Sequence, residues 1–284
     1  MTSTSPTVRQ RELGKRLREL RNERDLTIED VAERLLCSPT KISRLETGAR
    51  RPSLRDVRDL CGLYDVENSA SAQLMDLARQ ARAQGWWAEF DDLNLYPYIG
   101  LEQEAKFITC YSMYYVPGLL QTAEYAQEII TAISPKMDRN IQRQRVEARL
   151  RRQQLLEEDK PPGYRVLLDE AVLHRQVGGP TLMAAQLSHL LEAGRRGKVT
   201  FQVVPFELGA HAAQDSNFVL LEFEEDSNLS PVVFVESLLG GHYFERKPDI
   251  IRYREAVDHL RDSALSPRDS VQRVRELREK YGSQ

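Results

Sequence analysis

Short apolar stripes alternate with polar helix-start signals along the first eighty residues, a pattern that predicts a bundle of short helices. A longer helix from about Arg9 to Arg24 carries leucines at helical spacing on one face. Three shorter helices follow, and they begin at Thr27, Ser38-Pro39 and Pro52-Ser53. After a polar stretch between Asp65 and Ala72, predicted to be a hinge, a further helix runs from about Ala72 to Gln84. We therefore expect an all-α domain over residues 1–83.

Beyond this domain the apolar pattern alternates between helix and strand periodicity. Amphipathic stretches predict helices at about Leu101–Phe107, Thr122–Thr131, Asp138–Leu156, Thr181–Arg195, Asp249–Arg261 and Pro267–Tyr281. Short apolar runs predict strands at Tyr164–Leu168, Val199–Val204, Phe218–Phe223 and Val232–Glu236. The stretch from Trp86 to Gly100 is predicted to be irregular. The fold class expected overall is α+β, with a larger mixed α/β domain around one small sheet over residues 84–284.

The second and third predicted helices are short and joined by a tight turn, which predicts a helix-turn-helix. If Ile42 and Leu45 face the core, the outward positions of the third helix are Thr40, Lys41, Ser43, Arg44 and Thr47. A helix of this kind fits the major groove of DNA, where residues near its N-terminus meet base edges.

Residues 26–32, LTIEDVA, and residues 38–52, SPTKISRLETGARRP, resemble the Xre-type, phage-repressor-like DNA-binding domain. Chemistry favours base reading by Arg44, whose guanidinium can pair with guanine, together with Thr40 and Ser43. The residues predicted to contact phosphates are Thr27, Ser38, Lys41, Arg50 and Arg51. The resemblance also implies a structural ion pair between Arg21 and Glu46.

The chain departs from that family at three positions. Ile28 stands where the family often has a phosphate-binding Gln, and Pro39 stands where a hydrogen-bonding base reader is frequent. Leu36 occupies a turn position where the family favours Gly. If the turn keeps a positive φ, we expect Leu36 to be strained by about 1–2 kcal/mol.

A second resemblance covers the rest of the chain. Its motifs are VPGLLQTAEYA at residues 116–126, Arg149-x-x-Arg152-Gln153, LDEAVL at residues 168–173, VPF at residues 204–206 and GAH at residues 209–211. They resemble the C-terminal domain of actinobacterial helix-turn-helix regulators of the WhiJ-like, antitoxin-like type. The resemblance implies a transcriptional regulator with a small protein partner encoded nearby. An alternative is an antitoxin that mainly sequesters such a partner and binds DNA for autoregulation.

Composition and charge narrow the class of protein. The 284 residues carry a formal net charge of −3, which by itself argues against nucleic acid as a partner. That charge divides into +3 over residues 1–83 and −6 over the remainder, so the basic excess coincides with the predicted helix-turn-helix. No apolar run approaches the roughly 20 residues that cross a bilayer. The three cysteines form no C-x-x-C pair, and we expect a cytoplasmic protein.

Candidate chemistry elsewhere is sparse. The five histidines lack metal-ligand spacing. Acidic residues at predicted strand ends could hold Mg²⁺ in a nuclease, and they are Asp169, Glu170, Glu222, Glu224 and Glu236. Solvated strand ends, with Asp169 as a helix N-cap, are the simpler interpretation. We expect no catalytic residue, no metal and no cofactor.

Two further expectations concern partners. One short recognition helix rarely supplies enough affinity for operator DNA, so we expect a homodimer on paired half-sites. The C-terminal domain is expected to dimerise and to receive a small protein or an unknown small-molecule effector. The arginine-rich helix near residues 138–156 could serve as a second nucleic-acid surface or dock on an acidic partner.

Overall fold

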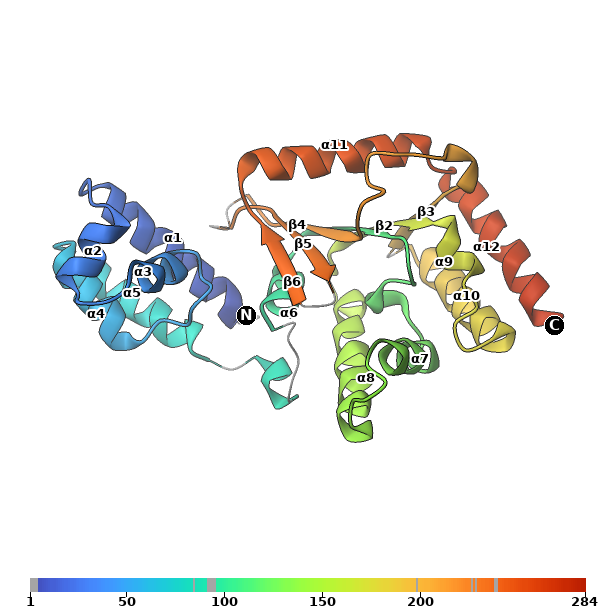
Figure 1. Ribbon diagram of the computed structural model, residues 1–284, viewed down its shortest axis with the longest axis horizontal. Coiled ribbons are helices and arrows are strands. Elements are labelled where there is room, and N and C mark those ends of the chain that lie inside the picture. The colour runs from blue at the N-terminus through green and yellow to red at the C-terminus, as the bar shows by residue number, and fades with distance from the viewer. Residues whose placement is uncertain are drawn as a thin grey trace. The chain divides into compact units, whose positions relative to one another are not determined.

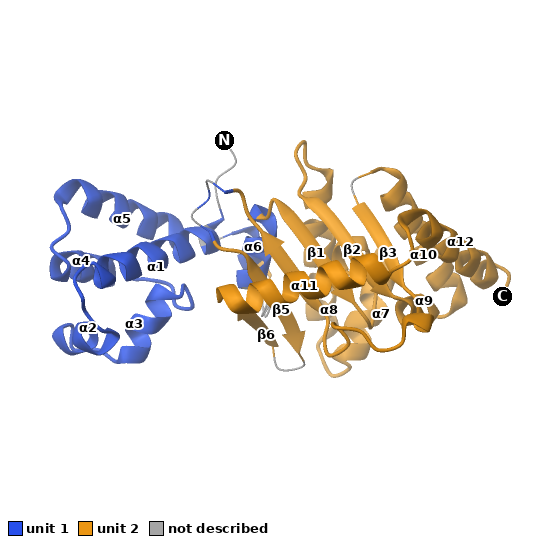
Figure 2. Cartoon of the chain, turned by 90° about the horizontal axis from the view of Figure 1, so that it is seen from above, with its two compact units in different colours: residues 1–88, 96–104, 225–229 blue, residues 89–95, 105–224, 230–284 orange. Residues whose placement is uncertain are grey.

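The computed structural model describes residues 5–83, 85–90, 96–197, 199–225, 227, 229–237 and 240–284. The chain forms two compact units (Figure 2). The first comprises Met1–Ala88, Tyr96–Glu104 and Glu225–Leu229, and the second comprises Glu89–Leu95, Ala105–Glu224 and Ser230–Gln284. The first unit thus also includes Tyr96–Glu104, which lies beyond the boundary predicted after residue 83.

The first unit is helical, as predicted. Its helices are α1 (Pro6–Asn22), α2 (Ile28–Arg34), α3 (Pro39–Glu46), α4 (Leu54–Leu63), α5 (Asn68–Ala81) and α6 (Tyr96–Glu104). A 3-10 helix, η1 (Trp86–Glu89), follows α5. One apolar core gathers the inward faces of α1 to α5 and includes Leu13, Ile42 and Leu77, each at most 6% exposed.

The predicted starts of the three short helices α2, α3 and α4 are confirmed, because a hydroxyl caps each of them. Thr27 Oγ1 accepts a hydrogen bond from Asp30 N at 3.1 Å, and Ser38 Oγ accepts one from Lys41 N at 3.2 Å. Ser53 caps α4 in a capping box. In each case the side chain satisfies a backbone N–H that lacks a partner within the helix.

The hinge predicted between Asp65 and Ala72 is wrong. α5 already begins at Asn68, and Leu74, Leu77 and Ala78 of this helix are buried in the same core as α1 and α4. The polar residues of the stretch form the exposed first turn of α5. Small and polar composition therefore marks a helix start here and not a linker.

The second unit is built on a six-stranded mixed sheet with the order β3-β2-β1-β4-β5-β6. The strands are β1 (Phe107–Ser112), β2 (Gly163–Asp169), β3 (Val199–Val204), β4 (Phe218–Glu222), β5 (Val232–Ser237) and β6 (Gly240–Phe244). β1, β2 and β3 run parallel, and β4, β5 and β6 extend the sheet in antiparallel pairs. The predicted α+β fold class with one sheet is confirmed.

Two strands escaped prediction. The helix expected over Leu101–Phe107 is confirmed only as far as Glu104, because Phe107 begins β1. The prediction that Trp86–Gly100 is irregular is wrong where α6 begins, at Tyr96. β1 buries polar Thr109 and Ser112 among its apolar residues, which breaks the apolar run that identifies a buried strand. β6 opens with two glycines and lies at the sheet edge, where strand propensity is a weak signal.

Helices cover both faces of this sheet (Figure 1). The helices are α7 (Ala123–Ile133), α8 (Arg139–Gln153), α9 (Glu170–His174), α10 (Pro180–Arg195), α11 (Lys247–Ser263) and α12 (Pro267–Gly282). Of three 3-10 turns, η2 (Gly118–Leu120) lies between β1 and α7, η3 (Gln154–Glu157) between α8 and β2, and η4 (Phe206–Leu208) between β3 and β4. α11 lies along one face and buries Ile250, Val257 and Leu260 there, whereas α7 and α8 lie on the other side. No helix in the described residues is long and apolar enough to span a membrane.

The turn between α2 and α3 has the geometry of a Schellman motif with a leucine in the position that usually holds glycine. Leu36 N donates to Glu33 O at 3.1 Å, and Cys37 N donates to Ala32 O at 2.9 Å. Leu36 has a φ of 50°, and its side chain is 95% exposed. This leucine therefore bears backbone strain without a packing gain in return.

We predict that Leu36→Gly leaves the free energy of unfolding unchanged or raises it by about 1 kcal/mol, because glycine relieves the left-handed strain. The matched control is Leu35→Gly, which removes a side chain packed against the core and should be clearly destabilising. Urea unfolding of the full chain measures both. A marked loss of stability in Leu36→Gly would refute the strain.

Candidate nucleic-acid interface

α3 presents one face to the core and the opposite face to solvent. Ile42 and Leu45 are buried at 2% and 3% exposure. Thr40, Arg44 and Thr47 are exposed on the outer face, where Ser43 and Lys41 are half-buried. The structure thus brings the three predicted base readers onto one surface of an eight-residue helix.

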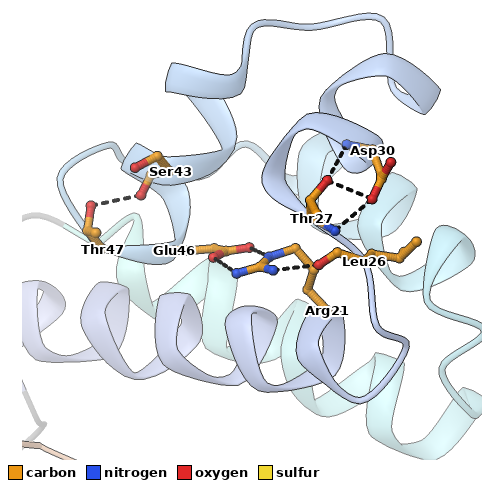
Figure 3. Close-up of polar contacts among 7 residues, drawn as sticks. All are labelled: Arg21, Leu26, Thr27, Asp30, Ser43, Glu46 and Thr47. Atoms are coloured by element: carbon orange, nitrogen blue, oxygen red, sulfur yellow. Dashed lines mark hydrogen bonds and ion pairs between the residues drawn. The ribbon is translucent and has the colours of Figure 1, made fainter.

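A buried ion pair joins α3 to α1 (Figure 3). Arg21 Nε donates to Glu46 Oε1 at 2.7 Å, and Arg21 Nη2 donates to Glu46 Oε2 at 3.0 Å. Arg21 Nη1 also donates to Leu26 O at 2.6 Å. The hydrogen bond to Glu46 raises the pKa of Arg21, although burial opposes it. One guanidinium therefore connects the end of α1, the approach to α2 and the end of α3.

The hydroxyl of Thr27 is occupied within its own capping box (Figure 3). It donates to Asp30 Oδ2 at 2.6 Å and accepts from Asp30 N at 3.1 Å. Hydrogen bonds from Thr27 lower the pKa of Asp30, so this carboxylate is ionised at neutral pH. A phosphate that approaches Thr27 would meet this negative charge, which disfavours the phosphate contact predicted there.

Lys41 has a partner that sequence reasoning missed. Its Nζ lies 2.6 Å from Asp56 Oδ1, and Asp56 is also the capping-box residue of α4. Burial by itself raises the pKa of Asp56, but hydrogen bonds from Lys41 and Ser53 outweigh it and lower the pKa. The S-x-x-D spacing at residues 53–56 signals the cap, but nothing in the sequence signals the ion pair.

The remaining predicted phosphate contacts are exposed around α3. Ser38 precedes the helix, and Arg50 and Arg51 follow it. The segment after α3 is tied back by Arg50 N, which donates to Arg44 O at 2.9 Å. Gly48 has a φ of 66°, and a Cβ there would lie 2.8 Å from Arg11 Cγ, so this position requires glycine.

The acidic residues considered for a nuclease do not gather. Asp169 caps α9, as predicted, because its Oδ1 accepts from Ala171 N at 2.8 Å. The other four bond to four different side chains: Glu170 to Arg273, Glu222 to Arg254, Glu224 to Lys106 and Glu236 to Tyr115. The described residues contain no group of three or more His, Cys, Asp or Glu that could hold a metal ion.

The second set of sequence motifs builds a braced loop over residues 116–122. Gln153 Nε2 donates to the carbonyl oxygens of Gly118 and Gln121, at 3.0 and 2.7 Å. Arg149 Nη1 donates to Gln121 Oε1 at 2.7 Å. Burial, with the nearby charge of Arg152, lowers the pKa of Arg149 to about 10, and the group stays cationic at neutral pH. Arg149 and Gln153, both on α8, therefore hold the loop over residues 116–122 against that helix.

We predict that Glu46→Ala lowers the free energy of unfolding by about 3 kcal/mol or more, because it leaves the buried Arg21 without its carboxylate. The double variant Arg21→Met with Glu46→Leu should lose less free energy of unfolding than the sum of the losses of Arg21→Met alone and Glu46→Leu alone. The control is Arg16→Ala, whose pair with Glu12 lies on the same helix but is more exposed, and which should cost about 1 kcal/mol or less. Equal losses in Glu46→Ala and Arg16→Ala, measured by urea unfolding, would contradict this role.

Two family matches agree with this geometry. Residues 12–74 match a family described as a helix-turn-helix domain, and residues 95–276 match one described as a domain of unknown function, DUF5753. Neither a curated protein nor a solved structure matches the chain. The helix-turn-helix match includes α2 and α3 and supports a DNA-binding regulator. The other match spans more than half of the sequence, and the chain therefore belongs to the DUF5753 family.

Proposed function

We propose that this protein is a sequence-specific transcriptional regulator that inserts α3 into the major groove of operator DNA. The observation that carries the proposal is the outer face of α3, which is exposed, bears Arg44 and Thr40, and lies within the helix-turn-helix match. The buried pair between Arg21 and Glu46 holds this helix at a defined angle on α1. A rigid helix with exposed hydrogen-bonding side chains is what direct base readout requires.

Within this proposal the exposed cations have different roles. Arg44 reads a base, since its guanidinium can donate two parallel hydrogen bonds to guanine O6 and N7. Arg50 and Arg51, in the segment after the helix, contact phosphates and set the register. Lys41 contributes less than an unpaired lysine would, because Asp56 already compensates its charge.

The finer family assignment is also a proposal. The motif over residues 38–52 supports an Xre-type domain, and the motifs between residues 116 and 211 support a WhiJ-like, actinobacterial regulator. Under this assignment the second unit receives a small protein partner, and the protein acts in the cytoplasm, where its operator lies. The hydrogen bonds that brace residues 116–122 support a structural role for the motif residues Arg149 and Gln153.

We further propose that the regulator binds DNA as a homodimer. α3 spans only eight residues and reaches few base pairs, so one copy offers limited affinity. A dimer with two-fold symmetry would bind half-sites about 10 base pairs apart, centre to centre. Sedimentation of the full chain, alone and with its selected DNA, tests this proposal. One monomer per DNA with a single half-site would contradict it.

We predict that Arg44→Ala weakens binding to the selected operator by about 1–3 kcal/mol and relaxes preference at one base pair. Arg51→Ala should weaken operator and random DNA alike, because it removes a phosphate contact. Arg58→Ala is the charge-matched control, since Arg58 is exposed on α4, a helix that contributes none of the proposed base or phosphate contacts. Fluorescence anisotropy at one fixed salt concentration measures all three. Equal losses on both DNAs for Arg44→Ala would remove it from the base readers.

A further inference from the structure

A cleft of about 270 Å³ opens in the second unit, where the end of α8 and η3 face α10. Its lining is mainly apolar and comes from five elements: Leu119 lies on η2, Leu150 on α8, Leu156 on η3, Ala193 on α10 and Val199 on β3. All the lining residues belong to the second unit. The cleft is therefore a separate feature from the α3 surface, and ligand binding to it can be measured without DNA.

The wall formed by η2 is held in place by side-chain amides. Gln186 Nε2 donates to Leu120 O at 2.7 Å, and its Oε1 accepts from Thr122 N at 2.8 Å. Gln153 Nε2 donates to Gly118 O at 3.0 Å from the other side. These bonds run between groups of the protein itself, so the fold holds this wall in place, and small-molecule sites are usually built on such walls.

The opposite wall is one stripe of α10. It carries His189, Glu192, Ala193 and Arg196, at the spacing that places residues on a single helical face. Ala193 has the smallest side chain of the four, and its place in the middle of the stripe leaves room for a ligand.

The charged side chains at the opening of the cleft form ion pairs with one another. Arg195 and Arg196 both pair with Glu192, at 2.8 and 3.1 Å, and Arg196 lies 3.5 Å from Glu157. The hydrogen bond from Arg195, followed by that from Arg196, lowers the pKa of Glu192 to about 2, so this network stays ionised at neutral pH. An ionic ligand would have to compete with these pairs, whereas an uncharged ligand would not.

His189 supplies one hydrogen-bonding group beside the apolar lining. Burial, with the charge of Arg196, lowers the pKa of His189 below its ordinary value. The imidazole is therefore neutral at pH 7 and offers one N–H donor and one nitrogen acceptor.

We propose that this cleft binds an uncharged apolar molecule about the size of two fused rings, which exchanges one hydrogen bond with His189. The volume of the cleft supports a ligand of this size, because an apolar cavity of about 150 Å³ accepts benzene. A volume of about 270 Å³ accommodates roughly one more ring. The mainly apolar lining, and the ion pairs already formed at the opening of the cleft, favour an uncharged ligand over an anion.

The test uses the full chain and 2-naphthol at pH 7, with naphthalene-2-sulfonate as the charged analogue. Isothermal titration should show saturable one-to-one binding of 2-naphthol and at least about tenfold weaker binding of the sulfonate, which must desolvate its charge. Failure of 2-naphthol to saturate, or equal or tighter binding of the sulfonate, would overturn the proposal.

Two variants locate the binding. Ala193→Phe should fill the cleft and abolish binding of 2-naphthol, whereas Ala184→Phe, on the same helix but outside the stripe that lines the cleft, should leave it unchanged. His189→Leu should weaken the binding of 2-naphthol about fivefold and leave the binding of naphthalene unchanged, since only the hydrogen bond is lost. Thermal unfolding verifies that each variant is folded, and Leu150→Trp replaces Ala193→Phe if that variant is not. Wild-type affinity in the folded cleft-filling variant refutes the proposed site.

Discussion

The buried ion pair between Arg21 and Glu46 is the constraint on which the proposed interface depends. Removing a carboxylate and a guanidinium from water costs several kcal/mol per ion, and only close pairing with further hydrogen bonds repays it. Here Arg21 makes two bonds to Glu46 and a third to Leu26 O. Burial and the nearby charge of Glu46 also raise the pKa of Tyr64, which stays a neutral phenol in the same core. The position of α3 is thus specified by charge as well as by apolar packing.

Local signals account for most of what the sequence predicted correctly. Thr27, Ser38 and Ser53 cap helices because a hydroxyl and the N–H groups that follow it lie within a few residues. The failures occur where tertiary contacts override composition. The polar residues before Ala72 have the composition of a linker, yet they form the first turn of α5, whose later residues pack in the core.

Contacts between distant residues are harder to foresee. The ion pair of Lys41 with Asp56 joins two helices, and no spacing rule announces it. β1 was missed because its buried polar residues interrupt the apolar run, although this strand lies between β2 and β4 inside the sheet. The cleft in the second unit depends on Leu119, Leu150 and Val199, which come together only through the parallel crossovers. The net charge of −3 was likewise a sum of +3 over residues 1–83 and −6 over residues 84–284.

The central claim is that the exposed face of α3 reads sequence in the major groove. Selection of bound fragments from random double-stranded DNA by the full chain, followed by methylation interference at guanine N7, tests it most directly, because N7 lies in the major groove. The account predicts one enriched sequence in which methylation of at least one guanine blocks binding. Binding without any enriched sequence would contradict this claim. An enriched site would also contradict it if methylation at every guanine were tolerated and no other major-groove contact were found.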